Sequence, residues 1–179
     1  MKAFVKEFFL NHKNTWSIIP SSSFLAKSMI SSIDFSEDLL IVQLWPWTWI
    51  ITKTILKKMS KNSKIISFEN NKNFDVYLSE IKDNRFKVIY DSAENIKNYI
   101  SKDKVDVIIS GVPLWSISDV IKEKILVESK ISLKIWWKFI QFQYFLQNKN
   151  DIKRIFWKYK LEYQLLNFPP AFIYKCKKI

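Results

Sequence analysis

The sequence of 179 residues predicts an α/β fold: a seven-stranded, mostly parallel sheet with an antiparallel last strand and with helices on both faces. Short apolar runs rich in β-branched residues alternate with helical patterns along the chain, at a spacing typical of βαβ units. Hydrophobic residues make up 48% of the chain, which is enough for a substantial core. The Asn-Phe-Pro-Pro turn at 167–170 separates the last two apolar runs and predicts a closing antiparallel hairpin.

The apolar runs and the helical patterns give the expected order of elements. Strands are expected at residues 38–44, 64–69, 86–90, 105–111, 138–144, 160–167 and 171–176. Helices are expected at residues 1–12, 21–33, 50–59, 74–81, 118–130 and 149–156, and another starts at 91–94. No repeat, low-complexity tract or linker divides the chain. We therefore expect one compact domain over 36–179, preceded by a helical extension over 1–35.

The expected N-terminal helix is amphipathic. Phe4, Val5, Phe8 and Phe9 share one face, and lysines lie elsewhere on it. Packing on the domain is one use of such a helix. Binding to an anionic membrane surface is the other, because basic residues that flank an aromatic face suit anionic lipid.

The chain is strongly basic, with 29 Lys and Arg against 17 Asp and Glu, a net charge of +12. Such a charge suggests an anionic partner, either nucleic acid or a membrane surface. However, only Arg85 and Arg154 are arginines, whereas readers of nucleic acid use arginine for bidentate contacts. The many lysines, isoleucines and asparagines also fit A+T-rich coding, so the charge by itself leaves both interpretations open.

Several functional classes are excluded by composition. Cys176 is the only cysteine and His12 the only histidine, so neither an internal disulfide nor a Cys/His metal site is expected. Mechanisms of the Cys–His or Ser–His type would have to use His12, which has no matching context. No signal peptide is visible, and the longest uncharged run, 39–52, is shorter than the roughly 20 residues that span a bilayer. We expect a cytoplasmic protein with, at most, peripheral contact to the inner face of the membrane.

The most unusual stretch is the turn after the first strand, Trp45-Pro46-Trp47-Thr48-Trp49. A tight strand-to-helix turn normally needs glycine, because the backbone must take positive φ and approach a ligand closely. Tryptophan occupies the positions where glycine is expected. The whole chain has one glycine, against an average usage of about 7%, and eight tryptophans.

Candidate binding groups follow four successive strands. In an open α/β sheet, ligands bind beyond the carboxyl ends of the strands, at the point where the strand order reverses. The turn at 45–49 follows the first strand, and Glu69 ends the second, where a carboxylate can accept both hydroxyls of a ribose. Asp91 and Ser92 follow the third strand, and residues 110–113 the fourth. Each acid alone can equally be a solvated residue or a helix cap, but their order indicates a cofactor that contains adenosine.

These residues resemble the class I S-adenosylmethionine-dependent methyltransferases, specifically the bacterial phospholipid N-methyltransferase-like proteins and the related rRNA adenine dimethylases. The resemblance covers nearly the whole chain and is carried by residues 17–22, 42–49, 68–69, 91–94, 108–113, 138–144 and 167–171. It implies a Rossmann-like fold and S-adenosylmethionine as cofactor, bound by Ser17, Trp45, Pro46, Trp47, Thr48, Trp49, Glu69, Asn70, Asp91, Ser92 and Ala93. It also implies a methyl-transfer pocket lined by Ser110, Gly111, Val112 and Pro113.

The sequence departs from the family pattern mainly at its glycines. Where the family loop reads Glu-Leu-Gly-Pro-Gly-Thr-Gly, this chain has Gln43 in place of the acid and tryptophan in place of all three glycines. Tryptophans 16, 136 and 137 also stand at family glycines, so six of the eight tryptophans do. Our hypothesis is that UGA codons, read as glycine in the source organism, were translated as tryptophan. The alternative is a tryptophan-rich, degenerate relative.

The resemblance implies methyl transfer, with a phospholipid head-group amine as the preferred acceptor. Methyl transfer to a neutral amine depends on proximity and alignment more than on a strong base, which fits the lack of a usable histidine. Methylation of adenine in RNA is the first alternative, although Ser110-Gly111-Val112-Pro113 departs from the Asn-Leu-Pro-Tyr-like segment of the adenine methylases. An inactive membrane- or nucleic-acid-binding remnant is the second. We expect a monomer.

Overall fold

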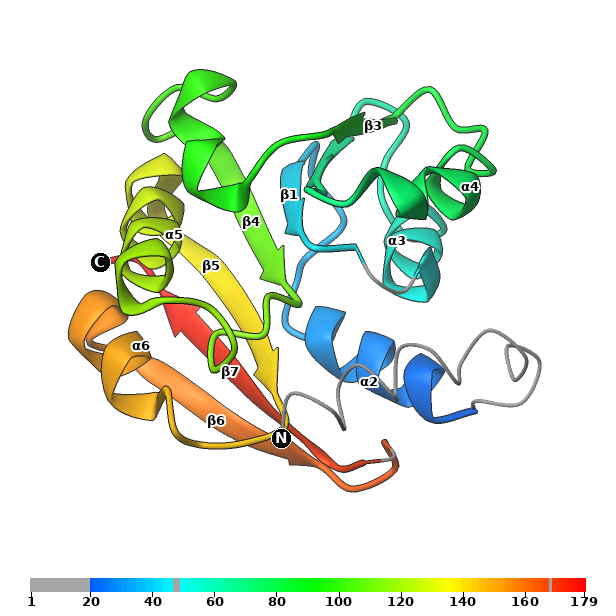
Figure 1. The fold of residues 1–179 in the computed structure, drawn as a ribbon. Helices are drawn as coiled ribbons and strands as arrows, with labels where there is room; N and C mark the ends of the chain where they lie inside the picture. The colour runs from blue at the N-terminus through cyan, green and yellow to red at the C-terminus, as the bar shows by residue number, and fades with distance from the viewer. Residues whose placement is uncertain (1–19, 47–48, 168) are drawn as a thin grey trace.

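The computed structural model describes residues 20–46, 49–167 and 169–179 (Figure 1). The predicted N-terminal helix at 1–12 lies outside these residues. The elements are, in chain order, α2 (Pro20–Ile30), β1 (Leu40–Leu44), α3 (Trp49–Leu56), β2 (Lys64–Phe68), the 3₁₀ helix η2 (Lys72–Phe74), α4 (Asp75–Leu78), β3 (Phe86–Ile89), the 3₁₀ helix η3 (Ala93–Asn98), β4 (Val105–Ser110), α5 (Asp119–Ser132), β5 (Leu133–Gln143), α6 (Lys149–Phe156), β6 (Tyr159–Gln164) and β7 (Ala171–Lys177).

The strands form one seven-stranded sheet in the order β3-β2-β1-β4-β5-β7-β6. Strands β1 to β5 pair in parallel, and β7 runs antiparallel to both β5 and β6. This confirms the predicted fold class, including the direction of the last strand. The order reverses between β1 and β4, which places a switch point at the carboxyl ends of these two strands.

Each face of the sheet carries its own apolar core, because successive strand residues point to opposite sides. On one face, Val42 and Ile108 pack with buried residues of α5 and α6 such as Ile125 and Phe156. On the other face, Ile41 of β1 packs with buried residues of α2 and α3: Leu25, Met29, Ile51 and Ile55. The sheet is therefore covered on both sides, as Figure 1 shows.

Two predicted helices are much shorter in the structure. The pattern at 74–81 predicts a helix, but only the 3₁₀ turn η2 and the four-residue α4 form there. The helix expected from 91–94 is the 3₁₀ helix η3. The first of them, α4, follows the short strand β2 near the edge of the sheet, where little apolar surface needs covering. However, η3 packs on α5 and buries Ile96, but it is interrupted at Asn95, whose backbone angles are not helical. In contrast, β5 begins at Leu133, five residues before the predicted start, directly after α5 ends.

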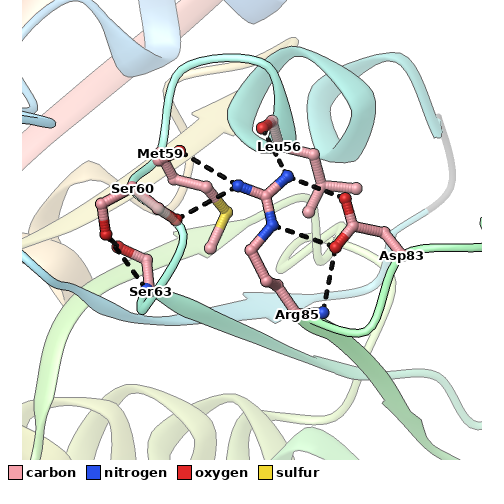
Figure 2. A network of polar contacts seen from close by, with 6 residues as sticks. All are labelled: Leu56, Met59, Ser60, Ser63, Asp83 and Arg85. Carbon is pink, nitrogen blue, oxygen red and sulfur yellow. Dashed lines mark hydrogen bonds and ion pairs between the residues drawn. The ribbon is translucent and has the colours of Figure 1, made fainter.

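Arg85, just before β3, joins this edge of the sheet to the end of α3 (Figure 2). Its guanidinium donates to the carbonyls of Leu56 (2.9 Å), Met59 (3.1 Å) and Ser60 (3.1 Å), which the helix end would otherwise leave unpaired. It also donates to both carboxylate oxygens of Asp83, at 3.0 and 2.7 Å. These bonds lower the pKa of Asp83 to about 2. One of the two arginines of the chain therefore stabilises the fold.

Candidate functional site

A pocket of about 110 Å³ lies at the carboxyl ends of β1, β2 and β4, beside the switch point. Hydrogen bonds extend the strand pairing one residue past each strand: Trp45 N–H to Phe68 O (2.9 Å), Gly111 N–H to Leu44 O (2.9 Å) and Glu69 N–H to Ile89 O (3.0 Å). The residues after successive strands are thereby held side by side. The pocket is lined by Trp45, Phe68, Glu69, Asn70, Asp91, Ser92, Ala93, Val112, Ile117, Ile121 and Ile125.

The structure brings together seven of the predicted site residues in this lining: Trp45, Glu69, Asn70, Asp91, Ser92, Ala93 and Val112. The apolar part of the wall comes from Phe68 and from α5 and the segment before it, with Ile117, Ile121 and Ile125. These three isoleucines were not predicted as site residues. Their spacing of four residues is the only signal for them in the sequence, and it is equally typical of a core-facing helix.

Glu69 is the most unusual polar group in the pocket, with only 1% of its surface exposed. Its Oε1 accepts a hydrogen bond from the backbone N–H of Asn71 at 2.8 Å. Its Oε2 is buried and has no hydrogen-bond partner among the described residues. Burial raises the pKa of this carboxyl, and the backbone hydrogen bonds at Asn71 and Asn70 oppose the rise. A buried acceptor of this kind suits a ligand that brings hydroxyl donors, such as a ribose.

Asp91 is largely occupied by its own loop. Its Oδ1 accepts from Ser92 N–H (2.6 Å) and Asn95 Nδ2 (2.8 Å), and its Oδ2 accepts from Tyr99 Oη (2.9 Å). The bonds from Asn95 and Tyr99, followed by that from Ser92, lower the pKa of Asp91. A carboxylate offers about four acceptor positions, so little capacity remains for a ligand. Asp91 thus fixes the loop that brings Ser92 and Ala93 to the pocket.

The predicted methyl-transfer segment 110–113 is rigidly held. Ser110 is buried and its Oγ accepts from Val112 N–H at 3.3 Å. The carbonyl of Val112 accepts from the side-chain amides of Gln141 (3.0 Å) and Gln143 (2.8 Å) on β5. Both glutamines are buried, and the Oε1 of each has no hydrogen-bond partner among the described residues. Ser110, Gly111 and Pro113 do not line the pocket, whereas Val112 does.

The two glutamines belong to the segment that carries the resemblance, but their role was not predicted. Glutamines on a strand are ordinary in sequence. Their shared acceptor, the carbonyl of Val112, exists only because β4 and β5 pair side by side, with Ser110 opposite Gln141.

The loop after β1 is only partly in the site. Trp45 lines the pocket, but Pro46 is buried outside its lining, and Trp49 begins α3 with its ring 5.3 Å from that of Tyr77. The ammonium nitrogen of Lys53 lies over the Trp49 ring, 5.6 Å from the centre of that ring. The predicted site residues Ser17, Trp47 and Thr48 lie outside the described part of the chain.

Gln43, which replaces the family acid, is satisfied within the fold. Its Oε1 accepts from Thr52 Oγ1 (2.6 Å) and Ser67 Oγ (3.2 Å), so it ties β1 to α3 and to β2. It does not line the pocket. Among residues 20–46, 49–167 and 169–179, no group of three or more His, Cys, Asp or Glu side chains is placed to hold a metal ion.

Comparison with known protein sequences finds one distant relative of this chain. The ornithine lipid N-methyltransferase of Singulisphaera acidiphila is 25% identical over 118 residues, which cover 63% of this chain. The match spans 62% of that protein, so it reaches less than two thirds of the relative's own length. No protein-family model matches the chain.

Solved structures show the fold more clearly. A methyltransferase from Aquifex aeolicus described as SAM-dependent matches with a TM-score of 0.68 at 11% identity, over 89% of this chain and 94% of that one. The precorrin-6Y C5,15-methyltransferase of Geobacter metallireducens matches with a TM-score of 0.68 at 14% identity, over 86% and 88% of the two chains. The chain therefore has the Rossmann-like fold of the class I methyltransferases.

Proposed function

We propose that this chain is a methyltransferase that binds S-adenosylmethionine in the pocket beside the switch point. The observation that carries the proposal is Glu69, a buried carboxylate at the end of β2 with one unpaired oxygen. Its place in the strand order is the one at which open α/β sheets bind the ribose of an adenosine cofactor. The fold shared with methyltransferases supports the choice of cofactor.

In this proposal, each wall of the pocket contacts a different part of the cofactor or of the acceptor. Glu69 accepts hydrogen bonds from the ribose hydroxyls, and Ile117, Ile121 and Ile125 cover the adenine with apolar surface. Ser92 and Ala93, held by Asp91, close the adenine side. The cofactor supplies an electrophilic methyl group on a sulfonium. Val112, fixed by the two glutamine amides, lines the side from which the acceptor approaches.

We further propose that the acceptor is the amine of a lipid head group. The named activity of the Singulisphaera acidiphila relative supports this choice. Four exposed apolar side chains also lie at the carboxyl edge of the sheet: Phe145 and Leu146 after β5, and Leu165 and Leu166 after β6. Because β5 and β6 run in the same direction, these two loops emerge at the edge where the pocket opens. An apolar rim beside a methyl-transfer site suits a substrate embedded in a membrane.

A membrane enzyme of this kind would act from the surface. Among the described residues, no helix is both long enough and apolar enough to cross a bilayer. Peripheral binding through the apolar rim and the lysine-rich surface, at the cytoplasmic face of the membrane, fits the net charge of +12.

Adenine methylation in RNA is the second candidate, favoured by the same charge. Both arginines, however, are bound to carboxylates of the fold. Arg85 pairs with Asp83, and Arg154 pairs with Glu123 through both of its terminal nitrogens. Arginine is the residue most suited to bidentate contacts with phosphates and bases. This arrangement favours lipid over RNA as the acceptor.

A single assay separates the candidates. The protein purified from its own organism is incubated with methyl-labelled S-adenosylmethionine and either phosphatidylethanolamine vesicles, vesicles containing ornithine lipid, or rRNA. Label in a lipid amine supports the proposal, and label in RNA replaces it with the second candidate. Absence of label from all three substrates, with cofactor binding also absent, would indicate an inactive remnant.

A further inference from the structure

Four residues other than glycine have positive φ in the described part of the chain, and three of them are tryptophans: Trp45 (57°), Trp136 (72°) and Trp157 (58°). The fourth is Asp103 (54°). A Cβ atom makes this region costly, and a bulky side chain makes it rarer still, whereas aspartate enters it more readily. The only glycine, Gly111, does not have positive φ. Conformations that demand glycine are thus held by tryptophan.

Trp157 stands directly after α6, with φ 58° and ψ −52°. Its N–H donates to Lys153 O (2.8 Å), and the N–H of Lys158 donates to Phe156 O, which forms a tight turn around Trp157. Because its ψ is negative, Trp157 is at the centre of a classic γ-turn and not in the left-handed helical region, and this turn is rare and strained for a residue with a Cβ atom. The indole is 77% exposed, so no core packing explains a tryptophan.

Trp136 lies in an irregular part of β5. Val105 pairs with Leu133, but Val107 pairs with Lys138, so β5 carries extra residues between the two pairs. On the side of β7, Trp136 and Trp137 together oppose Lys178, whose N–H donates to Trp137 O (3.0 Å), and antiparallel bulges with two residues against one can have a glycine with positive φ at the first position. The N–H of Trp136 donates to Lys178 O (2.7 Å), which fixes the backbone, while the side chain is 63% exposed. Hydrogen bonding thus fixes the backbone, whereas the exposed indole meets the ammonium of Lys177, 5.1 Å from the ring centre.

Trp45 combines a positive φ with a place in the pocket wall. Its N–H is held by Phe68 O, so the backbone cannot relax without breaking the pairing beyond β1. The pocket has a volume of about 110 Å³. Pockets that bind ligands as large as the proposed cofactor usually have a volume of roughly 300–1,000 Å³. An indole in the wall is therefore unfavourable for the backbone and for the ligand alike.

We propose that positions 45, 136 and 157 are glycines in the protein that the organism makes, and that glycine at 45 enlarges the pocket to admit the cofactor. The tryptophans then arise from UGA codons that the organism reads as glycine, and the remaining tryptophans have the same origin. Composition agrees, since a chain of 179 residues would ordinarily contain about 13 glycines and this one contains one. The part concerning the cofactor rests on the proposed function; the part concerning the backbone does not.

The gene gives the first test. UGA at codons 45, 136 and 157 supports the proposal, and UGG at these codons overturns it. Tryptic peptides of the protein purified from its own organism give an independent reading by mass spectrometry. Glycine in the peptides that span these positions supports the proposal, and tryptophan overturns it.

Thermal unfolding tests the backbone argument in the chain with tryptophan. Trp136→Gly and Trp157→Gly each remove an exposed indole from a positive φ, so each should raise Tm by about 2–6 °C. Trp137→Gly is the matched control, because Trp137 packs against both cores and is not at positive φ. It should lower Tm in this background. If Trp136→Gly and Trp157→Gly lower Tm as the control does, the argument from φ is wrong.

Calorimetric titration with S-adenosylhomocysteine tests position 45. A chain with glycine at all eight tryptophan positions is compared with one that keeps only Trp45. The first should bind about 10–100-fold more tightly, as expected when an overpacked site is relieved. Equal binding would overturn the role of position 45. If neither chain binds while UGA codons are found, the recoding stands and the proposed cofactor site fails.

Discussion

The carboxylate of Glu69 accepts a hydrogen bond from the backbone N–H of Asn71 at 2.8 Å, and this bond engages only one of its two oxygens. The loop after β2 therefore orients the side chain but leaves Oε2 for a ligand. A solvated residue at a strand end would not be buried, so the surroundings of Glu69 favour a binding role over the alternative of an ordinary surface acid.

The first prediction follows from this arrangement. Glu69→Gln keeps the size of the side chain and removes its charge, so it should weaken cofactor binding about 10–100-fold, the range expected for a charge-assisted hydrogen bond. Calorimetry on the all-glycine chain measures the effect. An unchanged Kd would show that Glu69 does not contact the cofactor.

The same substitution has a predicted effect on stability. Because burial raises the pKa of Glu69, the folded chain binds a proton more readily than the unfolded chain does. Stability from this group is present at pH below its unfolded pKa of 4.5 and is lost as pH rises through the folded pKa. This contribution lowers the Tm of the parent chain between acidic and neutral pH, and Glu69→Gln should make that decrease smaller. If the curves of Tm against pH for the two chains are parallel, the raised pKa of Glu69 is contradicted.

A second prediction concerns Asp91. Three protein donors lower the pKa of its carboxyl, so its contribution to stability is present above the unfolded pKa of 3.8 and is lost as pH falls through the folded value. Asp91→Ala should abolish this acid-dependent part and free the loop that carries Ser92 and Ala93. We expect weaker cofactor binding and a lower Tm at neutral pH, with a difference in Tm that shrinks in acid, where the parent chain has lost the same contribution. Calorimetry and thermal scans at acidic and neutral pH measure the two effects.

A third prediction compares the two arginines. Arg85→Ala leaves carbonyls at the end of α3 without a donor and Asp83 without its partner, so it should cost about 2 kcal/mol of folding free energy. Arg154→Ala breaks only an exposed pair with Glu123 and should cost less than about 1 kcal/mol. Urea unfolding measures both. Equal losses would mean that the capping bonds of Arg85 contribute little.

A fourth prediction tests the apolar rim. The double substitution Leu165→Ser and Leu166→Ser should reduce binding to anionic phosphatidylethanolamine vesicles about 10-fold or more, because two exposed leucines would no longer enter the membrane. Affinity for S-adenosylhomocysteine should not change, because neither residue lines the pocket. Ile135→Ser is the control, an equally exposed apolar residue near the start of β5, away from the carboxyl edge. Equal losses in both variants would contradict a specific membrane contact at the rim.

Much of the fold could be predicted because burial determines the spacing of apolar residues along the sequence. The runs at 105–111 and 118–130 predict β4 and α5 within two residues, since buried strands and amphipathic helices differ in the period of their apolar residues. The pattern at 74–81 has the same period but forms only α4, because a helix at the edge of the sheet has little surface to pack against.

The candidate site was predictable only where strand order determines it. Glu69 and Val112 were expected at the carboxyl ends of neighbouring strands, and the structure places both in the pocket. The sequence could not show that Asp91 is taken up by its own loop, or that Trp49 lies against Tyr77. Those contacts depend on where short irregular segments turn, which no periodic pattern records.

The sequence by itself determined the alternation of strands and helices, the position of an acid at the end of β2, and the excess of tryptophan at the expense of glycine. Only the tertiary structure decided which tryptophans occupy backbone conformations that glycine favours, and it selects positions 45, 136 and 157. The physical reason is that side-chain type sets the cost of a positive φ, but the hydrogen bonds of the folded sheet and of α6 decide where a positive φ is required.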